Sequence, residues 1–247
     1  MAIVVPGIQG QPIHAHHFTG RMRRNPRILT WLSLIQPAAF LDSATWRMAP
    51  RKGPFLARYN GAVPQWAAVG DYVAPNFPVA SDVGFWEISE QFANPGNFGL
   101  TVAMRATDGF TEPVALRFSN GDRVYPRPNH NSSGTGLVYR QAGTDLLVPV
   151  GTSAPLNATQ YLNVSYAAAS RRISWQLNGG QIYQATAGAE WAALSAIPTL
   201  NLVVGQAIQA QRFGGQILDA ALWGSDFLGN EDDLGFVAEY MAVAHGI

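Results

Sequence analysis

The sequence predicts an all-β fold in which antiparallel strands form a sandwich, and three observations support that prediction. Apolar and polar residues alternate along residues 161–166 and again along residues 173–177, which is the period of strands that bury one face. Asn178, Gly179 and Gly180 follow the second run, and an Asn-Gly step supplies the positive φ angles that a tight hairpin needs. The chain also holds seven Trp, eight Tyr and twelve Phe beside 25 Gly and 16 Pro, a composition typical of many short strands joined by turns.

Length and cysteine content narrow the possible classes of protein. At 247 residues, the chain is long enough for one large sandwich or for a smaller domain with an arm. The absence of cysteine excludes disulfides, thiol nucleophiles and cysteine-ligated metals. Pro6 and Gly7 interrupt the start of the chain before a signal-peptide core can form, and no apolar stretch reaches the ~20 residues that span a bilayer. We therefore expect no signal peptide and no membrane insertion.

The zero net charge hides an uneven distribution. Residues 1–58 hold eight basic residues and a single acid, Asp42, so they carry +7 and the remainder carries −7. Weak periodicity and frequent Pro and Gly accompany this basic excess. We therefore expect residues 1–78 to form a basic N-terminal arm or attachment segment, and residues 79–247 to form the folded domain. The apolar run at residues 28–35 is also consistent with a strand of the sandwich, and leaves that boundary open.

The arm contains the residues that we expect to attach the protein to a larger assembly: His14, His16, His17, Arg21, Arg23, Arg24 and Arg27. Imidazole is a common ligand for zinc and nickel. In a strand, however, the first two histidines face one side and the third faces the other, and no carboxylate or cysteine lies near in sequence, so we expect no metal. Clustered arginines also neutralise nucleic acid phosphates. Because this run is short and lies in no recognisable binding motif, we favour an acidic protein partner over nucleic acid.

From residue 79 onward the pattern indicates one strand after another. Turn residues separate them, as in the Asn-Pro-Gly-Asn step at 94–97 and the Ser-Asn-Gly-Asp step at 119–122. The expected strands cover residues 85–92, 99–105, 114–118, 123–125, 137–140, 145–150, 161–166, 173–177, 181–184, 200–205 and 215–223. The large aromatic residues expected in the core are Trp86, Trp175, Trp191 and Trp223.

The last segment changes period and predicts a short helix. Asn230 can cap a helix whose first turn, residues 231–233, is acidic and faces the positive end of the helix dipole. Apolar residues then fall on one helical face, and Gly246 is a stop signal. The residues of that face are Leu234, Val237, Met241 and Ala244.

Three stretches of these elements resemble the concanavalin A-like, laminin-G-type jelly roll. They are ISWQLNGGQIY, LNLVVGQ and the terminal FGGQILDAALWGSDFLGNEDDLGFVAEYMAVAHGI, which is similar to the family's last strand followed by a capped helix. The match departs from the family at Asp219-Ala220, where an acid followed by an aliphatic residue is common. The resemblance implies an antiparallel jelly-roll β-sandwich with a short C-terminal helix, here preceded by the extended N-terminal arm. Domains with such endings are frequent in structural proteins of tailed phages and phage-like particles, and also in bacterial surface proteins.

A polar loop between two expected strands is the candidate glycan site. Proteins bind sugars with aromatic rings and a few planar amide or carboxylate groups. The residues expected to provide them are Asp122, Tyr125, Arg127, Asn129, His130, Asn131 and Tyr139. The same residues are equally consistent with an ordinary solvated loop. Calcium is an alternative through Asp122 and Asn120, but two oxygens fall far short of the six to eight ligands that it takes, so no cofactor is expected.

Enzymatic motifs are incomplete. A glucanase on this fold needs two carboxylates on one strand face, and Glu87 and Glu90 point to opposite faces. A nucleophile elbow, a zinc-protease helix and a Walker loop are all absent from the sequence. We therefore expect a non-enzymatic protein, with a glycoside hydrolase as the alternative.

Together these features predict a structural and adhesive protein on the surface of a phage or phage-like particle, of the capsid-spike, head-fibre or tail-fibre type. It would be made in the bacterial cytoplasm, attach to other particle proteins through its N-terminal segment, and contact host-surface polysaccharide through the jelly roll. Homo-oligomers are expected because repeated weak sugar contacts gain avidity. The alternatives are a free bacterial lectin and a cement protein without a glycan ligand.

Overall fold

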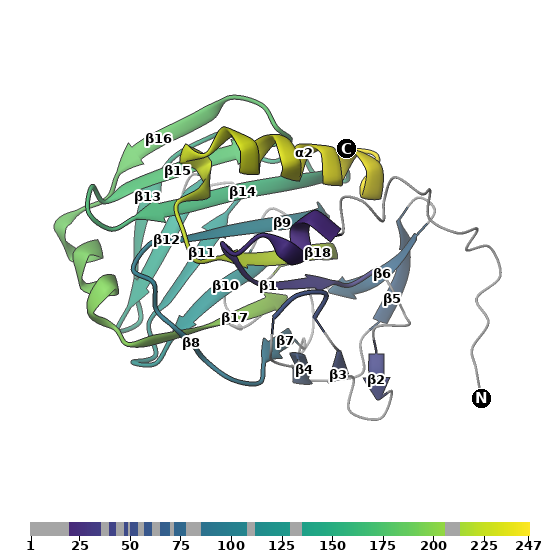
Figure 1. Cartoon of the computed structure of the whole chain (residues 1–247), viewed down its shortest axis with the longest axis horizontal. Coiled ribbons are helices and arrows are strands. Elements are labelled where there is room, and N and C mark those ends of the chain that lie inside the picture. The colour runs from purple at the N-terminus through teal and green to yellow at the C-terminus, as the bar shows by residue number, and fades with distance from the viewer. Residues whose placement is uncertain are drawn as a thin grey trace.

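The structure is a computed structural model that describes residues 20–35, 40–42, 47–48, 50–53, 57–60, 65–69, 72–77, 85–107, 112–128, 135–205 and 213–247. In this part of the chain, two antiparallel sheets pack face to face, and a C-terminal helix lies on the outer side of one of them (Figure 1). The predicted fold class, an all-β sandwich with a short C-terminal helix, is confirmed.

The first sheet is built around a long central pair of strands, β9 (Phe98–Ala106) and β18 (Gly215–Trp223). Its other strands, across the described residues, are β16 (Ile182–Thr186), β15 (Arg172–Leu177), β14 (Thr159–Ala167), β6 (Tyr72–Phe77), β5 (Gln65–Val69) and β1 (Ile28–Ser33). The Asn178-Gly179 turn forms as predicted: the φ angles of these residues are 48° and 68°, and β15 pairs with β16 beyond it.

The second sheet carries, on its outer face, the candidate site described below. Its strands, in spatial order across the described residues, are β13 (Thr144–Pro149), β12 (Gly136–Gln141), β11 (Arg123–Arg127), β10 (Val114–Phe118), β17 (Thr199–Gly205), β7 (Phe85–Ile88), β4 (Ala57–Asn60), β3 (Arg47–Met48) and β2 (Phe40–Asp42), with β8 (Phe92–Ala93) beside β17. The four strands from β10 to β13 pair in succession, and tight turns join β10 to β11 and β12 to β13 and help to set the register of those two pairs.

The main core lies between the two sheets. Trp86, Trp175 and Trp191 are fully buried there, as expected from the sequence. Trp191 lies in a 3-10 helix (Ala189–Ala196), and the Tyr166 hydroxyl donates a hydrogen bond to its backbone oxygen at 3.0 Å. The fourth tryptophan, Trp223, is also fully buried, but in a second apolar cluster under the C-terminal helix, where its ring stacks on that of Phe227.

Helix α2 (Glu231–His245) has the predicted start and end. The Asn230 side chain accepts a hydrogen bond from the backbone N–H of Asp233, and Gly246 ends the helix with a φ of 69°. The helix covers the outer face of the first sheet (Figure 1), so that face is buried too. Polar residues of β14 that alternation placed toward solvent are buried as a result. Asn163, for example, is fully buried and accepts a hydrogen bond from the Thr101 hydroxyl at 2.9 Å.

The expected boundary at residue 78 is wrong for the described strands. Six strands between residues 28 and 77 belong to the two sheets: β1, β5 and β6 to the first, and β2, β3 and β4 to the second. β2, β3 and β4 are only two to four residues long and β6 contains Pro75, so alternation in the sequence marks these strands weakly. The alternative, that the run at residues 28–35 is a strand of the sandwich, is confirmed by the pairing of β1 with β18. Residues 1–19 lie outside the described part.

In the described part of the chain, none of the helices has the length and apolar character that a membrane crossing requires.

Candidate functional site

A row of three arginines crosses the outer face of the second sheet. Arg117 on β10 lies directly opposite Arg123 on β11, which in turn lies opposite Arg140 on β12. Residues that face each other on neighbouring antiparallel strands project from the same side of a sheet. The core-facing neighbours on these strands, such as Leu116 and Val124, are fully buried, so the three arginine side chains leave the sheet on the side away from the core.

Acidic residues pair with the two ends of this arginine row. Arg117 Nη1 lies 2.7 Å from Glu87 Oε1 on β7, and Arg140 Nη1 lies 3.6 Å from Asp145 Oδ1 on β13. The side chains of the two end arginines are 29% and 27% exposed, so solvent reaches the row. Arg123, at the centre of the row, has an arginine opposite it on each neighbouring strand. Burial and the charges of Arg117 and Arg140 lower the pKa of Arg123, and a nearby glutamate, Glu112, opposes this shift.

Glu112 is a buried acid close to the same arginines. Its side chain is fully buried, and neither carboxyl oxygen forms a hydrogen bond with any described residue. Burial raises its pKa to about 8, although the charges of Arg123, Arg140 and Arg117 oppose that shift. At pH 7 most of this carboxyl is therefore protonated, and it contributes little negative charge to balance the row.

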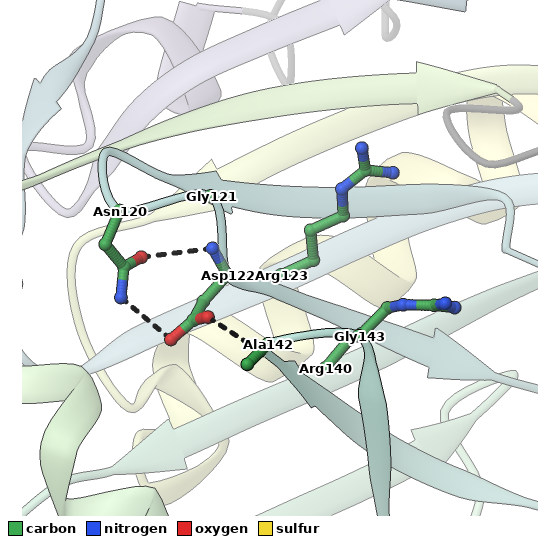
Figure 2. A pocket seen from close by; sticks show the side chains of 7 residues that line it. All are labelled: Asn120, Gly121, Asp122, Arg123, Arg140, Ala142 and Gly143. Atoms are coloured by element: carbon green, nitrogen blue, oxygen red, sulfur yellow. Dashed lines mark hydrogen bonds between the residues drawn. The ribbon is translucent and has the colours of Figure 1, made fainter.

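A pocket opens where the β10–β11 and β12–β13 hairpins turn. It has a volume of about 350 Å³, at the lower end of the range for small-ligand sites. Its lining residues are Asn120, Gly121, Asp122, Arg123, Arg140, Ala142 and Gly143. Figure 2 shows Arg123 and Arg140 extending to the same side, away from the carboxylate of Asp122. Two members of the arginine row thus form the basic wall of the pocket.

Asp122 holds the two hairpin turns together. Its Oδ2 accepts hydrogen bonds from the Asn120 side chain at 2.8 Å and from the Tyr139 hydroxyl at 2.7 Å, and its Oδ1 accepts one from the backbone N–H of Ala142 at 3.4 Å (Figure 2). Gly121 and Gly143, with φ angles of 90° and 87°, permit the tight turns that bring these groups together. Because both carboxylate oxygens already have partners, we assign Asp122 the role of positioning the pocket wall.

The residues predicted to bind a glycan differ in burial and in their interactions. Tyr125 and Tyr139 are both fully buried, so neither ring is available as a stacking platform for a sugar, and that part of the prediction is wrong. Burial raises the pKa of both hydroxyls. Arg127 is only 6% exposed and pairs with Asp145 at 3.1 Å. Three other predicted residues lie outside the described part: Asn129, His130 and Asn131.

The structure also places the expected attachment arginines, and two of them interact with the chain's own C-terminal helix. Arg27 Nη1 lies 2.5 Å from Asp233 Oδ2, and Arg21 Nη1 lies 3.9 Å from Glu239 Oε2. Arg23 and Arg24 are exposed. This basic segment and the start of α2 together line a pocket of about 420 Å³. The histidines at positions 14, 16 and 17 lie outside the described residues.

Among the described residues, no three His, Asp or Glu side chains group closely enough to hold a metal ion. The glycosidase candidate Glu87 is engaged by Arg117 at 2.7 Å and by the Asn201 amide at 3.4 Å. Ser89, which shares its strand face in sequence, is exposed beyond the end of β7.

Sequence reasoning missed the arginine row and Glu112. Alternation already placed Arg117 on the polar side of its strand, and the turn at residues 119–122 implied a hairpin with Arg123 beyond it. Combining these two signals with a predicted register for the next hairpin would have aligned the three arginines. Nothing local marks Glu112 as buried, because the environment that buries it comes from other strands.

No protein-family model and no curated protein sequence matches this chain. Solved structures do resemble it. Domain 4 of AbnA, a GH43 extracellular arabinanase from Geobacillus stearothermophilus, in complex with arabinotriose, has a TM-score of 0.53 at 12% identity over 80% of this chain and 92% of that one. Trypanosoma rangeli sialidase, in complex with 2,3-difluorosialic acid, has a TM-score of 0.54 at 11% identity over 90% of this chain and 34% of that one.

At such low identity these likenesses concern the fold alone. The protein spans about a third of the sialidase chain and nearly all of the arabinanase domain. The chain is therefore similar in architecture to β-sandwich domains found in glycan-processing proteins.

Proposed function

We propose that the protein is a non-enzymatic adhesive component on the surface of a phage or phage-like particle, and that it contacts host-surface polysaccharide through the pocket between its two hairpin turns. The observation that carries the glycan contact is this pocket, which Arg123 and Arg140 line beside the turn that contains Asn120 and Asp122. Guanidinium groups are planar hydrogen-bond donors that suit sugar hydroxyls and carboxylates.

The fold adds indirect support. One similarly folded domain belongs to an extracellular arabinanase and is described in complex with arabinotriose. That ligand belongs to the arabinanase domain. For this protein the likeness only favours a sugar over other small ligands, because a fold does not assign a function.

The particle role rests on the charge distribution and on the sequence resemblance to phage structural proteins. Arg21 and Arg27 contact the protein's own helix, so Arg23 and Arg24 become the preferred basic residues for an acidic partner, together with His14, His16 and His17. Other particle proteins would be the partners, and the virion or particle surface the location.

A glycan array with the full-length protein at physiological salt tests the glycan contact. We expect binding that Arg123→Gln and Arg140→Gln weaken and that Arg171→Gln, in the turn between β14 and β15 of the other sheet, leaves unchanged. Light scattering on the same sample should give the mass of a homo-oligomer. Reducing-sugar release from the bound glycans should be absent, and release that Glu87→Gln abolishes would indicate a hydrolase instead.

Particle association is tested separately. An Arg23→Gln, Arg24→Gln variant should be lost from purified particles, whereas Arg171→Gln should stay with them. Glycan binding without any particle association would indicate a free lectin. Particle association without glycan binding would indicate a cement protein.

A further inference from the structure

We propose that the hairpin pocket is one end of a longer binding surface, on which the protein holds a linear stretch of several sugar residues across the outer face of the second sheet. This inference rests on the proposed glycan contact and specifies the length of the ligand that the same site takes. We call this surface the polar band, and its residues are Asp145, Arg140, Arg123, Arg117 and Glu87.

Backbone register aligns the polar band across the sheet. Asp145 on β13 lies opposite Arg140 on β12, and Arg140 lies opposite Arg123 on β11. Arg123 lies opposite Arg117 on β10, whose Nη1 atom is 2.7 Å from Oε1 of Glu87 on β7. The sheet places β17 between β10 and β7, so at roughly 4.8 Å between neighbouring strands the distance from β13 to β7 is about 24 Å. A single sugar ring covers only a small part of that length.

The polar band is open to solvent and continuous with the pocket. The side chains of Asp145 and Glu87, at its two ends, are 26% and 24% exposed, and those of Arg140 and Arg117 are exposed to a similar extent. Arg123 and Arg140 also line the hairpin pocket, where their side chains extend to the same side (Figure 2). A sugar bound in the pocket would therefore have further polar side chains beside it, along the direction that crosses the strands.

The polar band offers both donors and acceptors of hydrogen bonds. Its arginines are paired with acids at both ends, Arg140 with Asp145 at 3.6 Å and Arg117 with Glu87 at 2.7 Å. A guanidinium has more N–H donors than one such ion pair uses, and a carboxylate only accepts. Sugar hydroxyls donate and accept, so a chain of them suits this mixture. The phosphate oxygens of a nucleic acid only accept, and the two carboxylates would repel them.

Arg117 is the residue that separates a short ligand from a long one. It does not line the hairpin pocket, because it lies on β10 beyond Arg123. Its guanidinium carbon lies 5.5 Å from the centre of the Phe85 ring, and its Nη1 atom contacts Glu87, so the side chain is held on two sides. A side chain fixed in this way loses little conformational freedom when a ligand binds. Arg117 should therefore contribute to binding only when the ligand reaches beyond the pocket.

Isothermal titration calorimetry of the full-length protein with oligosaccharides of graded length tests the inference. The probes are size-fractionated oligosaccharides of one to six residues from dextran, mannan and xylan, and a ladder of the same sizes from the capsular polysaccharide that binds best on the glycan array. Duplex DNA is the non-sugar polymer. The variants are Arg140→Gln in the pocket, Arg117→Gln at the far end of the polar band, and the matched control Arg171→Gln. Glu87→Gln, which preserves side-chain volume, is a second far-end variant should Arg117→Gln fail to fold. Each is checked for an unchanged melting temperature.

We expect the affinity of the wild type to rise roughly tenfold or more from the monosaccharide to the tetrasaccharide. Arg140→Gln should weaken the binding of every length. Arg117→Gln and Glu87→Gln should weaken the hexasaccharide by roughly fivefold more than the disaccharide, the effect of about one hydrogen bond, whereas a folding defect would weaken all lengths equally. Arg171→Gln should match the wild type.

Equal affinity for the monosaccharide and the hexasaccharide would overturn this inference and leave the proposed glycan contact intact. Far-end variants that affect long and short oligosaccharides alike would do the same. Duplex DNA binding as tight as the best oligosaccharide, or Arg171→Gln weakening the hexasaccharide as much as Arg117→Gln, would also overturn the inference. Failure to bind any glycan, on the array or in the ladders, would overturn both proposals.

Discussion

The Nε2 atom of His245, at the end of α2, lies 2.5 Å from Oδ2 of Asp219 on β18, and both side chains are almost completely buried. Two further buried groups donate to the same carboxylate: Trp31 Nε1 at 2.8 Å and the Tyr240 hydroxyl at 3.2 Å. Burial and the negative charge of Asp219 raise the pKa of Tyr240. A single acid thus ties β1, β18 and α2 together on the outer face of the first sheet.

Asp219→Asn should lower the free energy of unfolding by about 2–4 kcal/mol, because it removes the charge that three buried groups share while preserving side-chain volume. Urea titration of the full-length protein measures this loss. Asp232→Asn, an exposed acid in the first turn of α2, is the control and should cost less than about 1 kcal/mol. Equal losses in the two variants would show that the buried network contributes nothing specific.

Trp175→Ala should destabilise the protein by about 3–5 kcal/mol, because the indole is fully buried between the sheets and its removal leaves a cavity. The same denaturant titration measures the effect. Leu156→Ala, whose side chain is 40% exposed, should cost about 0.5 kcal/mol or less. A near-zero loss for Trp175→Ala would contradict the packing described for the core.

Tyr139→Phe should cost about 1–2 kcal/mol, because it removes the hydroxyl that donates to Asp122 at 2.7 Å and leaves that buried carboxylate short of a partner. Thermal and urea unfolding measure the change. Tyr183→Phe, at a partly exposed tyrosine, is the matched control and should be nearly neutral. If Asp122 also positions the pocket wall, Tyr139→Phe should weaken glycan binding more than Tyr183→Phe does.

Glu112→Gln should change how stability depends on pH. The pKa of Glu112 is raised from 4.5 to about 8 in the folded protein, so between these values the folded state binds more protons than the unfolded chain. The free energy of unfolding of the wild type should therefore fall as pH rises through this window. Gln stays neutral throughout, so the free energy of unfolding of the variant should not decline in this way. Near pH 8 it should exceed that of the wild type by on the order of 4 kcal/mol.

Urea titrations from pH 4 to pH 9 measure both curves. Glu190→Gln, at an exposed glutamate, is the control and should follow the wild type. Parallel curves for the wild type and Glu112→Gln would mean that the Glu112 carboxyl ionises at its ordinary pKa.

Local signals in the sequence predicted much of the fold. The strands at residues 161–166 and 173–177, the Asn178-Gly179 turn and the capped terminal helix all form where the pattern placed them. Each depends on side-chain alternation, on positive φ or on capping, and these properties belong to residues close together in the chain.

The candidate site could not be predicted in the same way. Tyr125 and Tyr139 have the chemistry of a sugar platform, yet both rings are fully buried. Arg117, Arg123 and Arg140 form one row only because the pairing registers of β10, β11 and β12 align them. A shift of one residue in either hairpin would send arginines to opposite faces of the sheet.

The sequence by itself therefore determined the class of fold, the turns and the terminal helix, since short-range geometry and the burial of one strand face are enough to specify them. Only the tertiary structure decided that strands from residues 28–77 complete both sheets, that Asp219 lies buried under α2, and that three arginines share one row. The physical reason is that burial and charge proximity depend on contacts between residues far apart in the chain, and backbone pairing between strands sets which of those residues meet.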